Sequence, residues 1–375
     1  MLELNINKQD FLTNYWQKKP LLIRNGFAQF EDPISAEELA GLACEEEVSS
    51  RVIITKENEW EIIQGPFESY EQYGEVNWQL LVQAVNHWHS DIAPLVEAFR
   101  FLPDWRFDDV MASFATPNGG IGAHIDNYDV FIIQGEGKRH WKVGNNGHHN
   151  KRNNDPQSAL VEDFEPIIDV TLHPGDILYI PPGYPHCGNT ISNSMSYSIG
   201  FRAPSQQELL TEMADYLLDN NLGHQRFTST SENNHKGSVS SLQQTQLIAL
   251  LTDIANQPEQ YKPMLGQLLS RNRFELDVCG DQSIEAEDVI DAIHSGLTIN
   301  RIGGLKVIHI EDDCVTRLFI DGEPYEFTSL SQQQLLFISN EFVLPNNWLI
   351  EQTQHHDVID FLVTMLKMGY YFISE

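Results

Sequence analysis

The chain has 375 residues and a formal net charge of −31, from 23 Lys and Arg against 54 Asp and Glu. A hydrophobic fraction of 41% is sufficient to fill folded cores, which excludes a largely disordered chain. No apolar run approaches the roughly 20 residues of a membrane span, and the first residues lack a signal-peptide pattern, so we expect a cytoplasmic protein. The negative charge disfavours nucleic acid as a partner and favours a basic polypeptide.

Length and cysteine content set further limits. At roughly 150 residues per domain, the chain is long enough for two or three domains. Its four cysteines, Cys44, Cys187, Cys279 and Cys314, are far apart and form no CxxC pair. This spacing argues against both a disulfide framework and a thiolate zinc site.

The first 91 residues mix helix and strand signals. Residues 35–47 predict a short acidic helix, because Ser35 and Glu38 stand at the spacing of a capping box. Residues 76–88 (VNWQLLVQAVNHW) also place their apolar side chains at helical spacing. We therefore expect an α/β elaboration at the N-terminus.

From about residue 100 to residue 204, short runs rich in Val, Ile, Phe and Tyr alternate with Gly, Pro and Asn. Strands are predicted over residues 110–116, 130–134, 138–143, 167–172, 176–181 and 194–203. Evenly repeated short strands with turn signals are typical of an antiparallel barrel or jelly roll.

Helical patterning dominates after Pro204. Helices are predicted over residues 206–220, 242–272, 283–296, 329–342 and 356–372, and two hairpin strands over 304–310 and 315–320. The order helix, hairpin, helix resembles a winged helix. Residues 276–375 hold 4 Lys and Arg against 17 Asp and Glu, a balance of −13, which argues against direct DNA binding. We interpret this region as a protein–protein or structural module.

A candidate metal site lies in the strand-rich region. His124 and Asp126 are two residues apart in GGIGAHIDNYDVF, and side chains at i and i+2 of an extended chain point to the same face. His186 follows in DILYIPPGYPHCGNT, just past a Pro/Gly turn. Two His and one Asp can form a facial triad with open positions on the metal, the ligand set of non-haem Fe(II) oxygenases. Zinc could also accept these ligands.

Arg139 is the second informative residue. In KRHWKV, period-two alternation puts Arg139, Trp141 and Val143 on one face and Lys138 on the other. The face with Trp141 and Val143 is predicted to look inward, which would bury a guanidinium at a cost unless an anion meets it. Two partners remain open: a small dicarboxylate bound bidentately, or a buried Asp or Glu of the protein.

Residues near the predicted ligands suggest where a substrate could bind. Tyr128 lies in phase with the two ligands of the HxD motif if the strand continues, so its ring could flank a long substrate side chain. An ordinary core tyrosine is the alternative. A guanidinium near the mouth of the barrel could be attracted by Asp104, Asp108 and Asp109, or these residues could form a solvated loop.

Together these motifs resemble the JmjC branch of the 2-oxoglutarate oxygenases, which have the cupin or double-stranded β-helix fold. The likeness is carried by SFATPNGGIGAHIDNYDVFIIQGEGKRHW, DILYIPPGYPH and YSIGFRAPSQQEL, and it extends over nearly the whole chain to the bacterial ribosomal oxygenases of this branch. The fold that it implies is α+β: a JmjC/cupin jelly roll, a helical dimerisation segment and a winged-helix-like C-terminal domain.

The resemblance implies a role for each motif residue. His124, Asp126 and His186 would ligate Fe(II), and Arg139 would meet the distal carboxylate of 2-oxoglutarate, with Ser113 also touching this cosubstrate. The implied enzyme is a 2-oxoglutarate-dependent dioxygenase that uses O₂ and releases succinate and CO₂. Its substrate would be an arginine of large-subunit ribosomal protein sixteen. Arg139 itself favours this group, because histidine-directed eukaryotic relatives tend to have Lys there.

The resemblance also implies a domain organisation. Residues 1–204 would form the catalytic JmjC/cupin domain, with its core at about 92–204. Residues 205–272 would form the helical region through which a homodimer assembles. Residues 273–375 would form the winged-helix-like domain.

Two interpretations of a different class remain. A non-enzymatic cupin regulator fused to a winged helix would bind duplex DNA. A zinc cupin acting as an isomerase or hydrolase would need no 2-oxoglutarate and would leave Arg139 unexplained. Within the oxygenase hypothesis, the residues alone do not separate arginine from histidine or another target, or hydroxylation from demethylation.

Overall fold

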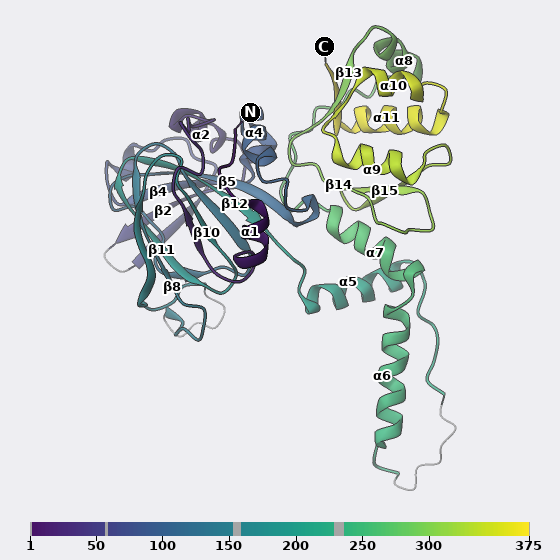
Figure 1. Ribbon diagram of the computed structural model, residues 1–375, viewed down its shortest axis with the longest axis horizontal. Helices are drawn as coiled ribbons and strands as arrows, with labels where there is room; N and C mark the ends of the chain where they lie inside the picture. The colour runs from purple at the N-terminus through teal and green to yellow at the C-terminus, as the bar shows by residue number, and fades with distance from the viewer. Residues whose placement is uncertain (1, 57–58, 153–158, 229–235, 375) are drawn as a thin grey trace. The chain divides into compact units, whose positions relative to one another are not determined.

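The computed structural model describes residues 2–56, 59–152, 159–228 and 236–374. The chain forms two compact units, which are shown in Figure 1. The first, here called the barrel unit, consists of Met1–Ala203 and Asn272–Asp277. The second, here called the C-terminal unit, consists of Pro204–Arg271 and Val278–Glu375.

Two antiparallel sheets build the barrel unit. The larger has the strand order β1-β10-β7-β12-β5-β4-β2-β3, with bounds Leu21–Ile23 (β1), Ser50–Lys56 (β2), Glu59–Gln64 (β3), Trp78–Val82 (β4), Phe107–Ala115 (β5), Asp129–Gln134 (β7), Ile177–Ile180 (β10) and Ser194–Phe201 (β12). The smaller has the order β6-β11-β8-β9, with bounds His124–Ile125 (β6), Lys138–Gly144 (β8), Pro166–Leu172 (β9) and Pro185–Ser192 (β11). All six predicted strands are present. β6 and β11 were not predicted, because their His, Cys, Gly and Asn residues give no strand signal.

Strand alternation separates two apolar layers in the barrel unit. On β7, Val130 and Ile132 pack with Trp141 of the smaller sheet, and this layer fills the barrel interior. Phe131 and Ile133 point to the opposite side and join the larger core beneath the N-terminal elements. Because both faces are covered, every residue of β7 is buried.

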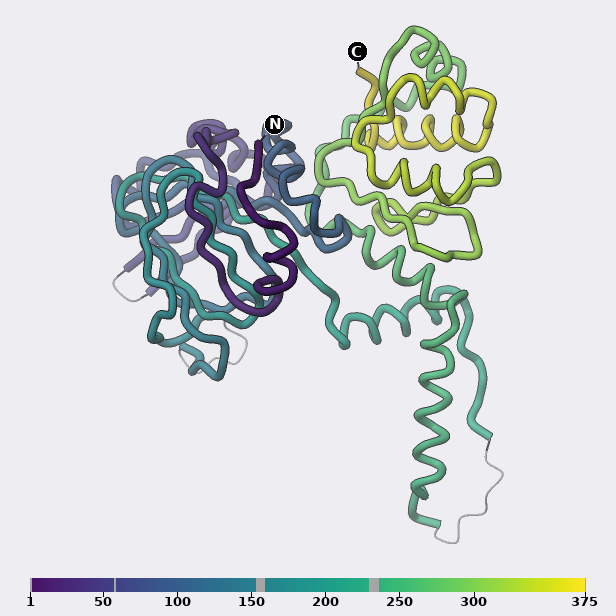
Figure 2. The backbone as a smooth tube through the Cα atoms, viewed as in Figure 1, coloured from purple at the N-terminus to yellow at the C-terminus, as the bar shows by residue number. Residues whose placement is uncertain are grey.

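Short N-terminal helices cover the outer face of the larger sheet. They are Lys8–Asn14 (α1), Ala36–Leu42 (α2), Val85–Trp88 (α3) and Ala93–Glu97 (α4), with 3-10 turns at Glu71–Tyr73, Ser90–Ile92 and Asp104–Arg106. The capping box predicted for α2 is confirmed: Glu38 N–H donates to the Ser35 hydroxyl (3.1 Å) and Ser35 N–H to the Glu38 carboxylate (2.8 Å). Figure 2 shows the purple N-terminal segment running beside the teal strands, where β1 pairs with β10.

The prediction of a helix over residues 76–88 is wrong for its first half. Trp78–Val82 forms the fully buried central strand β4, which pairs with β2 and β5, and only Val85–Trp88 is helical. A strand buried on both faces is a continuous apolar run, which periodicity cannot separate from a buried helix.

Three helices begin the C-terminal unit: Gln206–Asp219 (α5), Ser241–Ala255 (α6) and Pro258–Ser270 (α7). Ser205 and Ser240 cap α5 and α6 with capping boxes. α7 packs closely on the following domain, since a Cβ on Gly266 would lie 2.3 Å from the Phe319 ring. α5 and α6 bury none of their residues. No helix in the described ranges is long and apolar enough to cross a membrane.

The rest of this unit has the predicted winged-helix layout. Its helices are Ala286–His294 (α8), Gln332–Asn340 (α9), Asn346–Gln352 (α10) and His356–Met368 (α11). One three-stranded sheet, β17-β13-β18, contains Thr298–Arg301 (β13), Val343–Leu344 (β17) and Tyr371–Ser374 (β18). The other, β14-β15-β16, contains Val307–Ile308 (β14), Arg317–Ile320 (β15) and Glu323–Glu326 (β16).

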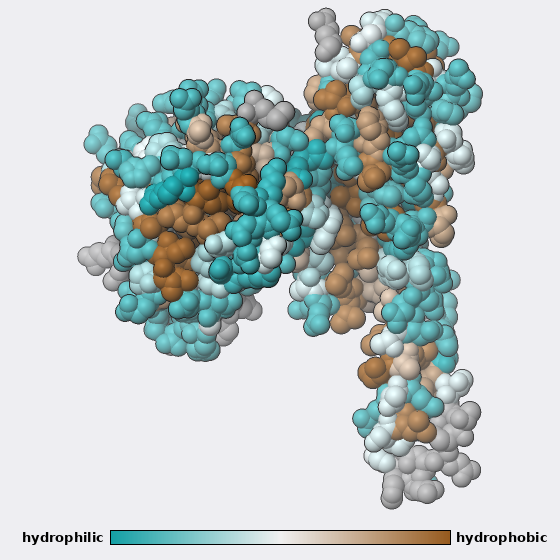
Figure 3. Space-filling view, viewed as in Figure 1, coloured by the Kyte–Doolittle hydropathy of each residue, from teal (hydrophilic) through white to brown (hydrophobic). Residues whose placement is uncertain are grey.

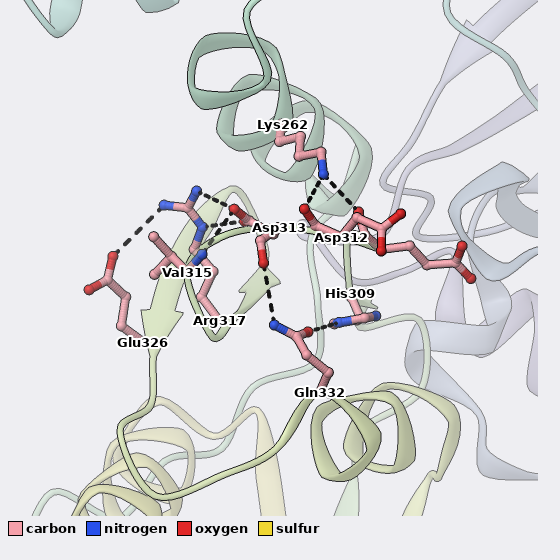
Figure 4. A network of polar contacts seen from close by, with 9 residues as sticks. Lys262, His309, Asp312, Asp313, Val315, Arg317, Glu326 and Gln332 are labelled. Carbon is pink, nitrogen blue, oxygen red and sulfur yellow. Dashed lines mark hydrogen bonds and ion pairs between the residues drawn. The ribbon is translucent and has the colours of Figure 1, made fainter.

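A polar network fastens α7 to the acidic loop between β14 and β15 (Figure 4). Lys262 on α7 donates to the carbonyl oxygen of Asp312, and the Arg317 guanidinium donates to the Asp313 carboxylate at 2.7 Å. Gln332 at the start of α9 donates to the Asp313 carbonyl oxygen at 3.4 Å. Part of the negative charge of this domain is therefore held by internal partners.

Candidate metal and cosubstrate site

The three predicted metal ligands meet at one point in the barrel unit. His124 on β6 and His186 on β11 are direct cross-strand partners, and their ring centroids lie 4.2 Å apart. The Asp126 carboxylate lies 3.6 Å from His186 Nε2. One ligand atom from each residue lies within 4.8 Å of the others, so the three can share one metal ion.

The predicted reason for this convergence needs correction. β6 ends at Ile125, so Asp126 lies just beyond the strand, and Tyr128 does not continue its alternation. The Asp126 backbone is held by the turn before β11, where the Gly183 N–H donates to its carbonyl oxygen at 2.9 Å. Pairing with β11 and this turn contact, rather than one extended strand, bring the carboxylate to the imidazoles.

Glycines before the first ligand are required by close backbone packing. A Cβ on Gly120 would lie 2.2 Å from the carbonyl oxygen of Gly188, and a Cβ on Gly122 would lie 2.3 Å from the Trp60 ring. No larger residue fits these approaches without moving the loop. The GGIG run therefore sets the position from which His124 enters β6.

Backbone hydrogen bonds orient both imidazoles. Nδ1 of His124 lies 2.9 Å from the Gly122 carbonyl oxygen, and Nδ1 of His186 lies 3.0 Å from that of Tyr184. A carbonyl can only accept, so each Nδ1 carries a proton, which leaves Nε2 as the atom of each ring that can ligate a metal. Burial, reinforced by His124, lowers the pKa of His186 to about 4 against the opposing effect of Asp126. His186 is therefore neutral at physiological pH, as a metal ligand must be.

Arg139 faces the barrel interior, as the alternation of β8 predicts. Its side chain is buried, whereas Lys138 is exposed on the opposite face. The guanidinium donates to the hydroxyls of Ser194 (Nε, 2.8 Å) and Ser113 (Nη1, 2.9 Å) and to the carbonyl oxygens of the same two residues (Nη2, 3.0 and 3.2 Å).

No carboxylate among the described residues pairs with Arg139. Burial lowers its pKa to about 10, and no charged group of the protein contributes to the shift. The guanidinium is still cationic at neutral pH. A buried cation without a counterion is costly, and the chemistry that satisfies it is an anionic ligand. The alternative of a protein Asp or Glu as its partner is therefore not supported.

An unpartnered hydrogen-bond donor lies beside the imidazoles. Trp141 packs on His186 with ring centroids 6.2 Å apart, and its indole N–H is buried without a hydrogen-bond partner in the part of the chain that the structure describes. An unsatisfied buried N–H costs free energy unless a ligand or water meets it. The interior thus offers a donor and a cation to an oxygen-rich ligand, next to three metal-ligating side chains.

The inner face of β5 extends this polar lining. Val110 and Ala112 belong to the outer core, so Asp109, Met111 and Ser113 alternate onto the interior face. Ser113 meets Arg139, and Asp109 stands four residues away, about 13 Å along the strand. The inner face of β5 thus carries Ser113, which contacts the buried Arg139, at one end and the buried carboxylate of Asp109 at the other.

Asp109 is held in a polar pocket. Its Oδ2 accepts from the Ala84 N–H at 3.0 Å, and the Gln83 amide, assigned with its nitrogen toward the carboxylate, donates at 2.7 Å while accepting from Arg51 at 3.3 Å. Desolvation and the neighbouring Asp108 raise the pKa of Asp109 to about 6. At neutral pH it is therefore mainly ionised.

Tyr128 lies near both this carboxylate and the metal ligand Asp126. It packs against the interior apolar layer. Burial first, and then the charges of Asp126 and Asp109, raise the pKa of its phenol. Its hydroxyl is therefore neutral and lies within electrostatic range of both carboxylates.

We compared the chain with known proteins to find the family to which this site belongs. A JmjC domain model matches residues 94–209, and a ROXA-like winged helix model matches residues 249–372. The ribosomal protein uL16 3-hydroxylase of Escherichia coli (strain K12) is 41% identical over 375 residues, which cover 99% of each chain. The X-ray structure of E. coli YcfD has a TM-score of 0.93 at 40% identity, covering 100% of both chains.

The chain belongs to the JmjC ribosomal oxygenases. The oxygenase is a 2-oxoglutarate-dependent dioxygenase, which confirms the family, enzyme class and fold predicted from the motifs. A structure of the ribosomal oxygenase YcfD from E. coli in complex with cobalt and 2-oxoglutarate matches with a TM-score of 0.90. The zinc-cupin and non-enzymatic interpretations are not supported.

Sequence reasoning missed several lining residues of the oxygenase. Ser194 and Met111 carry no motif, and only the period-two alternation of β12 and β5 could have put them on the inner face. The sequence pattern does not distinguish Asp109 from Asp104 and Asp108. The burial of Asp109 depends on β5 starting at Phe107, three residues before the strand predicted from the sequence.

Proposed function

We propose that this oxygenase uses Fe(II), O₂ and 2-oxoglutarate to hydroxylate an arginine side chain of ribosomal protein uL16, the large-subunit protein sixteen, with release of succinate and CO₂. One observation carries the proposal: a single barrel interior contains a two-His-one-Asp cluster, an unpaired guanidinium and, on the same strand face as its Ser113 partner, a buried carboxylate. The proposed substrate is based on the E. coli relative, which is named a uL16 3-hydroxylase.

In this proposal His124, Asp126 and His186 hold the iron. Two imidazoles and a carboxylate suit a divalent ion of this class. Bound Fe(II) supplies the activation of O₂ coupled to oxidative decarboxylation of 2-oxoglutarate. The chain's own task is to fix both Nε2 lone pairs through the carbonyl contacts of Nδ1 and to keep the interior closed to bulk water.

Arg139 and Ser113 bind 2-oxoglutarate in this proposal. The guanidinium offers charge-assisted hydrogen bonds to the distal carboxylate, and Ser113, which accepts from Nη1, helps to orient it. The unpartnered indole N–H of Trp141 is available to the same ligand. A dianion entering here would satisfy a cation that the protein itself leaves uncompensated.

An arginine target fits the end of the inner β5 face at which Asp109 lies. A substrate guanidinium would meet the ionised Asp109, and its aliphatic stem could pass beside Met111 and the Tyr128 ring. A histidine target, the second candidate, would be shorter and would need no carboxylate. The net charge of −31 supports encounter with a basic ribosomal protein, mainly through the association rate. Modification of a ribosomal protein accords with the expected cytoplasmic location.

The homodimer is also a proposal. α6 exposes Leu247, Ile248 and Leu251 by 43–60% and buries no residue. Figure 3 shows hydrophobic surface along this helix. An apolar face of this kind marks a protein interface, and the family resemblance makes a second copy of the chain its occupant. In the proposed domain organisation, residues 1–204 catalyse, 205–272 dimerise and 273–375 form a protein-contacting module without direct DNA binding, except that Asn272–Asp277 packs with the barrel unit.

Turnover with purified uL16 tests the proposed reaction. Wild-type enzyme with Fe(II) and 2-oxoglutarate is expected to form succinate and to add one oxygen atom to a uL16 arginine, located by tandem mass spectrometry. His124→Ala is expected to abolish both, whereas His140→Ala, a histidine on the outer face of β8 paired with Asp169, is the matched control. Asp109→Asn is expected to lower kcat/KM for uL16 and to leave 2-oxoglutarate binding intact. Oxygen found on a histidine would reject the arginine target.

A further inference from the structure

A segment from beyond the helical region completes the barrel unit. Asn272–Asp277 follows α7 in the sequence but belongs to the barrel unit. His87 on α3 hydrogen-bonds through Nδ1 to the carbonyl oxygen of Glu275 at 2.8 Å. Arg273 Nη1 lies 2.9 Å from Asp108 Oδ2. Two separate contacts therefore anchor the segment and bring one guanidinium to the start of β5.

The partner of Arg273 is a carboxylate whose side chain is largely buried. The Asp108 side chain is only 8% exposed, and its other cationic neighbour, Arg202, lies 4.0 Å away. The Arg273 side chain is half-exposed and stacks over the Phe274 ring at 4.5 Å. Removing the cation beside a largely buried carboxylate leaves that charge poorly compensated. Arg273 is therefore the close counterion of Asp108.

Asp108 directly precedes Asp109, the carboxylate proposed to meet the substrate. The charged and titratable groups around Asp109 are Asp108 on β5, Arg51 on β2, Arg273 on the anchored segment and Tyr128 before β7. Asp108 raises the pKa of Asp109, whereas Arg273 and Arg51 lower it. The ladder between β5 and β12 shifts register between Val110 and Phe107, and a Cβ on Gly200 would lie 3.5 Å from Asp109 Oδ1 and 3.7 Å from Asp108 Cβ. Both aspartates therefore lie on the same side of the strand, where Arg273 meets Asp108.

We propose that Arg273 is a positioning residue of this oxygenase, which neutralises Asp108 so that the adjacent Asp109 presents its negative charge to the substrate guanidinium. The inference deepens the proposed function and rests on its arginine target. It gives the segment between the helical region and the winged helix a role in substrate recognition. It also explains why this short segment is fastened to the barrel at His87 as well as at Asp108.

The pH dependence of kcat/KM for purified uL16 tests the inference. Without Arg273, Asp109 stays protonated to higher pH, so the acid limb of Arg273→Ala is expected to move upward. At about pH 6.5 the variant should lose about three- to tenfold in kcat/KM, and at about pH 8.5 less than about twofold. Arg273→Lys should keep most of the wild-type profile.

Arg24→Ala is the matched control. Arg24 and Asp176 form an ion pair of 2.6 Å with side-chain exposures of 47% and 5%, close to the 46% and 8% of Arg273 and Asp108. Arg24→Ala should lower the free energy of unfolding by a similar amount but leave the acid limb of the kcat/KM profile where it is in the wild type. An equal shift in Arg24→Ala would overturn the inference, because the effect would then be structural.

A double variant, Asp108→Asn with Arg273→Ala, tests whether Arg273 acts through the charge of Asp108. In an Asp108→Asn background there is no charge to neutralise, so adding Arg273→Ala should leave the acid limb unchanged. The same shift in that background, or no shift in the single variant, would overturn the inference alone. Calorimetric binding of Mn(II) and 2-oxoglutarate shows whether each variant is folded. If Arg273→Ala did not bind them, the pH profiles of Asp108→Asn and of the double variant would test the inference instead. A wild-type enzyme inactive on uL16 would overturn the proposed function and this inference together.

Discussion

Arg139 donates a hydrogen bond of 2.9 Å to the Ser113 hydroxyl, and this contact joins the two sheets of the jelly roll across its interior. Ser113 also lies 3.1 Å from the Ser196 hydroxyl on β12, so the guanidinium is held by a network rather than by one bond. Its orientation is fixed before any ligand enters. Pre-organised donors of this kind lower the ordering cost of binding a small dianion.

Replacing Arg139 is expected to remove 2-oxoglutarate binding while leaving the metal ligands in place. Arg139→Ala should weaken 2-oxoglutarate by about 30-fold or more, equivalent to about 2 kcal/mol, because it deletes the interior cation. The neighbouring Lys138→Ala, which changes an exposed side chain of the same strand, should stay within about twofold. Calorimetric titration with Mn(II) present measures both. Similar losses in the two variants would contradict the assignment.

Metal binding is expected to stabilise the protein through the three-residue cluster. Saturating Co(II) at about 100 times its Kd should raise the free energy of unfolding by about 2.7 kcal/mol, because the ion binds only the folded chain. His186→Ala should lose this gain, and His140→Ala should keep it. Thermal unfolding with and without Co(II) measures the difference. A full gain in His186→Ala would show that the ion binds elsewhere.

Close packing at Gly120 is expected to couple stability to the metal site. Gly120→Ala should lower the free energy of unfolding by about 1–3 kcal/mol and weaken Co(II), because its Cβ would lie 2.2 Å from the Gly188 carbonyl oxygen. Gly41→Ala, on α2 with nothing within 4 Å of the added Cβ, should be neutral or stabilising by up to about 1 kcal/mol. Urea unfolding of both variants checks the contrast. A neutral Gly120→Ala would mean that the loop can yield.

The exposed face of α6 is expected to control assembly. Ile248→Glu should convert a dimer to a monomer, because it places a charge in an apolar interface. Ile62→Glu changes a similarly exposed side chain on β3 and should leave the mass unchanged. Light scattering on the full chain reads out the result directly. A monomeric wild type would reject the dimer.

The metal cluster and the buried cation could be predicted from the sequence because each follows from a short local pattern. An HxD motif after glycines and a later histidine after a Pro/Gly turn suggested His124, Asp126 and His186. Alternation in KRHWKV correctly put Arg139 inside and Lys138 outside. The position of Arg139 follows from the period of a strand, whereas the convergence of the metal ligands also depends on the pairing of β6 with β11 and on the turn contact of Asp126.

Other features depend on contacts that no local pattern encodes. Trp78–Val82 is a strand because β2 and β5 pair with it on either side, although its spacing also suits a helix. Ser194 faces Arg139 only through the register of β12. Arg273 reaches Asp108 from 165 positions later in the chain, and its segment has no motif. Long-range pairing of this kind is visible only in the folded chain.

Mass spectrometry of ribosomal proteins from cells with and without this gene tests the central claim most directly. We expect uL16 from wild-type cells to be heavier by one oxygen atom, tandem spectra to place the oxygen on an arginine, and the His124→Ala strain to behave like the deletion. Identical uL16 masses in all three strains would contradict it, as would an oxygen that persists in the His124→Ala strain.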